Sequence, residues 1–134
     1  MKRLAILLAF AGASAQAQTP PVTAPAAPDS VEQQIVVIGE KLKSWKGSVA
    51  KAEGRLVCRT RTSTGDRKLD AIRCGAMLTC VRPLEAQVDE LMTSDRSRDD
   101  KRRAFDRLLV SAKPCMESYE DAAVARLAAE RAAS

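Results

Sequence analysis

The amino-acid sequence predicts a mostly helical α+β protein. A small N-terminal β-hairpin or sheet should pack on an antiparallel helical hairpin and a C-terminal helix. Apolar residues recur in steps of three and four through the second half of the chain, which is the spacing of a buried helix face. Before them, two short segments flank a Glu-Gly turn, the pattern of a hairpin. The chain also holds four cysteines, which we expect to form two disulfides.

The expected sheet lies at the start of the folded domain. Residues 35–39 are a β-branched run closed by glycine, and we predict a strand there. Residues 48–51 and 55–61 lie on either side of Glu53 and Gly54, a pair that favours a tight turn. These two segments therefore predict the β-hairpin.

The first convincing helix should begin after residues 63–66, Ser-Thr-Gly-Asp. Its expected buried face consists of ten residues at helical spacing: Leu69, Ile72, Ala76, Met77, Cys80, Val81, Leu84, Val88, Leu91 and Met92. Pro83 lies inside this pattern. We expect it to kink the helix or divide it in two, because proline removes a backbone donor.

A polar loop at residues 93–97 should separate this helix from the next. Ser97 and Asp100 have the spacing of a capping box, so the next helix should begin there and run through Phe105. Pro114 is expected to end that helix or to start another. The final helix is predicted from apolar residues at Met116, Tyr119, Ala123 and Leu127.

The N-terminus has the pattern of a secretory signal peptide, residues 1–17. Lys2 and Arg3 precede a short apolar run, and small residues follow, with cleavage readable after Ala15 or Ala17. The apolar run is about half the ~20 residues that a membrane span needs, so no transmembrane span is expected once the signal is removed. Residues 18–34, rich in proline and alanine, are a predicted flexible spacer before a single domain at residues 35–134. We expect a periplasmic or secreted protein.

Composition narrows the classes of function. The formal net charge is +5, and removal of Lys2 and Arg3 leaves +3, too weak a field for a dedicated nucleic-acid binder. The chain contains no histidine, which excludes histidine triads, imidazole acid–base catalysis and histidine–metal sites. The carboxylate pairs lie in runs rich in lysine and arginine. We therefore predict no catalytic residue, no cofactor and no metal ligand.

The cysteines are expected to be structural. Cys58, Cys74, Cys80 and Cys115 lack the C-x-x-C spacing of redox sites and the closely spaced pairs of zinc sites. Cys74 and Cys80 would lie about 9 Å apart along one helix, too far for a disulfide. A helical hairpin that turns near Asp95 would place Cys115 across from Cys74. This favours Cys58–Cys80 with Cys74–Cys115, and the alternative is Cys58–Cys74 with Cys80–Cys115.

One loop has the character of an anion site. It joins an arginine-bearing strand to a helix start, and its candidate residues are Arg59, Arg61, Thr64, Gly65 and Arg67. The other interpretation is that Asp66 or Thr64 caps the helix and Gly65 supplies the turn.

A second basic cluster is interleaved with acids. Its six cations are Arg96, Arg98, Lys101, Arg102, Arg103 and Arg107. Because four aspartates lie among them, the cluster predicts a salt-bridged solvent face, with binding to anionic envelope polymers as the less favoured interpretation.

Several segments carry a resemblance to known proteins. They are IVVIGEKLKSWKG at residues 35–47, LVCRTRTSTGD at 56–66, LDAIRCGAMLTC at 69–80 and the Pro-Cys pair at 114–115. With them the chain resembles small exported four-cysteine proteins of Gram-negative bacteria that have no assigned activity. The resemblance implies export and a domain cross-linked by disulfides, and it supplies no catalytic residue.

These observations favour a non-enzymatic exported envelope protein that binds a partner protein or an anionic polymer. The alternative is a small carboxylate-dependent hydrolase, or another enzyme, that uses the loop at residues 63–66.

Overall fold

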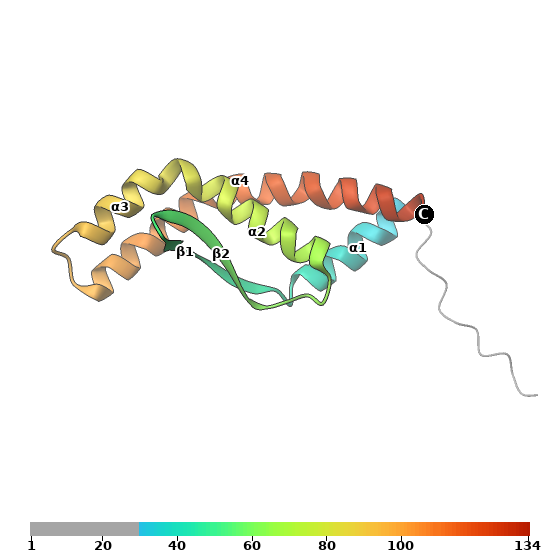
Figure 1. The fold of residues 1–134 in the computed structure, drawn as a ribbon. Coiled ribbons are helices and arrows are strands. Elements are labelled where there is room, and N and C mark those ends of the chain that lie inside the picture. The colour runs from blue at the N-terminus through green and yellow to red at the C-terminus, as the bar shows by residue number, and fades with distance from the viewer. Residues whose placement is uncertain (1–29) are drawn as a thin grey trace, which may run out of the picture.

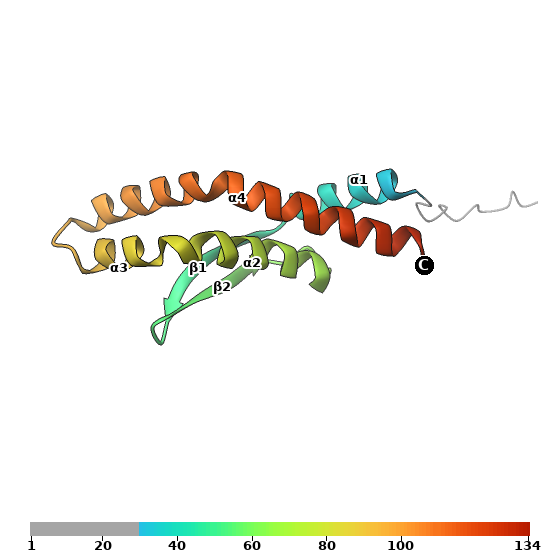
Figure 2. The same ribbon diagram turned by 90° about the horizontal axis from the view of Figure 1, so that it is seen from above.

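The computed structural model describes residues 30–134. The predicted signal peptide and most of the predicted spacer lie outside the described residues. The elements, in chain order, are α1 (Val31–Leu42), β1 (Lys46–Ala52), β2 (Arg55–Thr62), α2 (Arg67–Val81), a 3₁₀ turn η1 (Arg82–Leu84), α3 (Glu85–Thr93) and α4 (Arg98–Ala132). Together, α2 and α3 run antiparallel to the long α4, and the β-hairpin lies along α2 (Figures 1 and 2). The predicted fold class, mostly helical α+β, is confirmed.

The first element corrects the sequence prediction. Residues 35–39 are part of helix α1, not a strand, and residues 31–34, assigned to the spacer, are its first turn. Ser30 begins the helix with a capping box to Gln33. Gln34, Ile38 and Leu42 are the buried residues, at helical steps of four. Burial of this one face overrides the local β preference of the Ile-Val-Val run, because tertiary packing outweighs a weak local propensity.

The predicted β-hairpin is confirmed. Strands β1 and β2 are antiparallel, and the last pair, Ala52 with Arg55, leaves a two-residue turn. Both turn residues have positive φ, 51° at Glu53 and 73° at Gly54. Positive φ at both positions is the type I′ pattern, whose twist matches that of the flanking strands.

The prediction of the helical hairpin is right at Pro83 and wrong at Pro114. Pro83 lies in η1 and divides α2 from α3. Pro114 lies inside the continuous helix α4, so the predicted break there does not occur. Pro114 deprives the carbonyl of Val110 of its helical donor. Because both residues are exposed on α4, that carbonyl can bond water while neighbouring turns pack on α1, α2 and α3.

The two disulfides have the alternative pairing. Cys58–Cys74 joins β2 to α2 with a Cα–Cα distance of 5.5 Å, and Cys80–Cys115 joins α2 to α4 at 5.7 Å. The favoured pairing, Cys58–Cys80 with Cys74–Cys115, is therefore wrong. The loop at residues 94–97 does lie near Asp95, but the 3₁₀ turn at Pro83 interrupts the first arm and changes its register against α4. The residue that lies across from Cys115 is therefore Cys80.

The main core lies where α1, α2 and the C-terminal half of α4 meet. Its buried residues are Ile38, Leu42, Leu69, Ile72, Ala123, Leu127 and Ala128, with Tyr119 and Val124 packed against them. Gly75 lets α2 approach α4, because a Cβ there would collide with the Oη of Tyr119. Within the described part of the chain, no helix is long and apolar enough to cross a membrane.

We expect both disulfides to stabilise the fold, the second more than the first. Replacing Cys80 and Cys115 by alanine opens a loop with a sequence separation of 35, against 16 for Cys58 and Cys74. Loop-closure entropy then predicts losses of about 4 and about 3 kcal/mol in the free energy of unfolding. Urea unfolding of the two double variants measures both values. A larger loss for the Cys58/Cys74 variant would contradict this order.

The turn of the hairpin gives a second prediction. Glu53→Asn should stabilise the protein by about 0.5–1 kcal/mol, because asparagine adopts positive φ more readily than glutamate. Glu53→Gln is the matched control, since it removes the same charge and keeps the backbone strain. Equal stabilisation by both variants in thermal unfolding would show that charge, and not backbone conformation, is responsible.

Candidate functional site

The predicted anion loop binds a carboxylate of its own chain. Asp70, one turn into α2, reaches back to this loop. Its Oδ1 accepts from the Thr64 N–H at 2.9 Å and the Thr64 hydroxyl at 2.8 Å, and its Oδ2 accepts from the Ser63 hydroxyl at 2.5 Å. The Gly65 N–H donates to the Ser63 Oγ at 3.0 Å. The N–H groups expected to hold an external anion are thus occupied within the chain.

Asp66 completes this internal arrangement. Its carboxylate caps α2 by accepting from the N–H groups of Lys68 and Leu69, and it forms an ion pair with Arg131 at 2.5 Å. The Arg131 pair ties the start of α2 to the end of α4. The interpretation that Asp66 caps the helix is therefore confirmed. The loop holds the start of α2 against the end of α4.

The same hydrogen bonds bear on the hydrolase alternative. Donation from Ser63, and then from the Thr64 N–H, lowers the pKa of Asp70 below its ordinary value. A general base that works near neutral pH needs a raised pKa. The geometry of residues 63–70 therefore gives no support to that alternative.

Among the described residues, no hydrogen bond or ion pair joins the side chain of a predicted arginine to the loop at residues 63–66. Arg59 and Arg67 are exposed. Arg61 lines a different concave surface, to which Thr64, Gly65 and Arg67 do not contribute. We call this surface the Trp45 pocket, and its lining residues are Trp45, Lys46, Gly47, Arg61, Thr62 and Arg73. It lies where α1 passes into β1 and where β2 ends.

A β-bulge places Arg61 at this pocket. Lys46 pairs with Thr62 and Gly47 pairs with Thr60, so Arg61 has no partner across the hairpin. A bulge of this kind re-aims the side chain of the extra residue. Gly47 contributes by its size, because a Cβ there would collide with the ring of Trp45. Bulge and glycine together let an arginine and an indole line one surface.

Arg73 forms the helical wall of the pocket. One guanidinium nitrogen donates to both oxygens of Glu120 at 2.8 and 2.7 Å, and another donates to the carbonyl of Leu42 at 3.2 Å. The side chain thereby connects α2 with α4 and with the end of α1. Its Nε is buried and has no acceptor in the described structure, and the same holds for the Nε1 of Trp45. Buried donors of this kind are usually satisfied.

The pocket carries an excess of positive charge. Lys46, Arg61 and Arg73 line it, and none of its described lining residues is acidic. Glu120 neutralises Arg73 from the adjoining cavity. The pocket offers two cations, Lys46 and Arg61, that form no ion pair among residues 30–134, so its chemistry suits an anion.

Sequence reasoning identified Arg61 and missed Trp45, Lys46 and Arg73. Trp45 is the only tryptophan of the chain and stands next to a lysine at the start of a strand, a signal that was available. Arg73 gave no comparable signal, because its place beside the hairpin depends on how β2 packs on α2. The described residues also hold no group of three or more cysteine, aspartate or glutamate side chains suited to a metal ion.

Comparison with known proteins gives no further guide, since no family model, curated protein or solved structure matches this chain.

The hydrogen bonds that Asp70 accepts from Ser63 and Thr64 predict that the stability of the protein depends on pH. A carboxylate whose pKa is lowered by folding contributes stability above its unfolded pKa, about 4, and loses it as pH falls through the folded value. Asp70→Asn should therefore destabilise the protein at pH 7, and its difference from wild type should shrink between pH 4 and pH 2. Denaturant titrations at each pH measure this difference. Asp106→Asn, at an exposed position of α4, is the control, and an unchanged Asp70→Asn difference would contradict the prediction.

Proposed function

We propose that this protein is a non-enzymatic, exported envelope protein that binds an anionic group of a partner in the Trp45 pocket. One observation carries the proposal. Lys46, Arg61 and Arg73 line a single concave surface with no described acid in its lining.

The proposed location follows from the sequence and from the disulfides. The N-terminal residues have the charge, apolar run and small residues of a signal peptide. Both disulfides are consistent with an oxidising, extracytoplasmic compartment, since such bonds are rare in a reducing cytosol. A periplasmic or secreted protein would meet anionic polymers and the acidic surfaces of other envelope proteins.

The ligand class follows from the donors. Arginine forms paired hydrogen bonds with carboxylate or phosphate, and lysine adds a point charge. The contacts of Arg73 and the Cys58–Cys74 disulfide already hold the walls of the pocket in place. Binding therefore costs less conformational entropy. We therefore propose a carboxylate or phosphate group as the part of the partner that is bound.

Trp45 supplies the readout for the test. As the only tryptophan, it reports on the pocket by its fluorescence. Titration of the disulfide-bonded mature protein with a polyuronate and with polyphosphate should give a saturable change for at least one of them, and neutral dextran should give none. Arg61→Gln should weaken the binding about tenfold or more, the expected cost of a charge-assisted hydrogen bond.

Arg59→Gln is the matched control. It removes the same charge from the same strand and lies outside the pocket lining. We expect it to change the affinity less than about twofold, an effect of net charge alone. Equal weakening by both variants, or no saturable signal with either polyanion, would contradict the proposal.

A further inference from the structure

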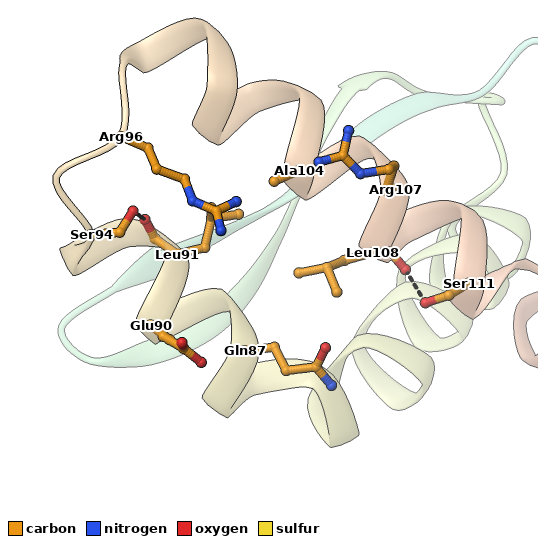
Figure 3. Close-up of a pocket in the computed structure, with 9 residues that line it drawn as sticks. All are labelled: Gln87, Glu90, Leu91, Ser94, Arg96, Ala104, Arg107, Leu108 and Ser111. Carbon is orange, nitrogen blue, oxygen red and sulfur yellow. Dashed lines mark hydrogen bonds between the residues drawn. The ribbon is translucent and has the colours of Figure 1, made fainter.

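A second concave surface lies at the free end of the helical hairpin, between α3 and α4 (Figure 3). We call it the α3–α4 groove. It has a volume of about 460 Å³, within the range of ligand and side-chain pockets. Its lining includes Glu90, Leu91, Arg96, Ala104, Arg107 and Leu108. It shares no lining residue with the Trp45 pocket, so an inference about it stands apart from the proposed function.

Two arginines approach each other over this groove. The guanidinium of Arg96, from the loop before α4, and that of Arg107, from α4, point toward one another on either side of Ala104 (Figure 3). Neither takes part in an ion pair within the described part of the chain. Asp100, an acid near Arg96, is already bonded to Ser97 and Arg103. A carboxylate between the two guanidiniums would offset their repulsion and accept hydrogen bonds from both.

Apart from Gln87, Ser94 and Ser111, which are polar and uncharged, the rest of the groove is apolar or acidic. Leu91 and Leu108 face it, and Glu90 lies on the α3 wall with Leu91 between it and Arg96 (Figure 3). The pattern across the groove is therefore positive, apolar and then negative. A simple anion would use only the arginines. An anionic lipid would bring negative charge close to Glu90.

We infer that the α3–α4 groove docks an amphipathic segment of a partner protein. The segment presents an acidic side chain to Arg96 and Arg107, an apolar side chain to Leu91 and Leu108, and a basic side chain to Glu90. This order of side chains occurs on one face of a helix at spacings of three and four, which is the usual form of helix-in-groove recognition. Charge complementarity selects this occupant over a lipid surface.

The test uses ¹⁵N-labelled mature protein with both disulfides intact. The probe is a synthetic amphipathic helical peptide that carries Glu, Leu and Lys in this order on one face. Saturable chemical-shift changes should be confined to amides of α3, of the turn at residues 94–97 and of the first half of α4. The double variant Arg96→Gln/Arg107→Gln should raise the dissociation constant for the peptide about tenfold or more. Its own spectrum shows whether it remains folded.

Arg98→Gln/Arg102→Gln is the matched control, because it removes two exposed arginines of α4 that do not line the groove. It should leave the dissociation constant within about twofold. Equal weakening by both double variants would overturn the inference, as would peptide-induced shifts at the Trp45 pocket instead of the groove. Shifts of groove amides with phosphatidylglycerol vesicles, and none with the peptide, would overturn it in favour of a membrane surface.

Discussion

The arrangement of the whole domain depends on helix α2, because both disulfides begin there. Cys74 and Cys80 are six residues apart, so they point in directions about 120° apart around the helix. Cys74 therefore binds the hairpin through Cys58, and Cys80 binds α4 through Cys115. A core with so few aromatic rings benefits from covalent links that lower the entropy of the unfolded chain.

The first of these links also shapes the Trp45 pocket. Cys58–Cys74 fixes β2 on α2, and Cys74 is the residue that follows Arg73. The bulge further along β2 directs Arg61 to the same surface as Arg73. Arg73 then contacts Glu120 of α4 and the end of α1. The pocket is thus lined by residues of β1, β2 and α2 and by Trp45, which precedes β1. Packing and a disulfide bring them together, which is why the pocket has no compact sequence motif.

Local chemistry made much of the fold predictable, and long-range packing accounts for the errors. Glu53-Gly54 and Pro83 act through their own backbone preferences, so the hairpin and the division of the first long helix follow from sequence. Residues 35–39 have a β preference that burial of Ile38 overrides, and Pro114 is tolerated because its turn faces solvent. The disulfide pairing depended on the register of α2 against α4, which changes with the 3₁₀ turn at Pro83. At the site, Arg61 was identified, and Arg73 was not, because only the fold brings it to the hairpin.

The most direct test of this account is the disulfide connectivity of protein produced in an oxidising compartment. Trypsin alone cannot decide it, since no lysine or arginine separates Cys74 from Cys80. Cleavage after Met77 with cyanogen bromide, followed by trypsin, divides the two cysteines under non-reducing conditions. We predict linked peptides that contain Cys58 with Cys74 and Cys80 with Cys115. Peptides that link Cys58 with Cys80, or free thiols at all four positions, would contradict the account.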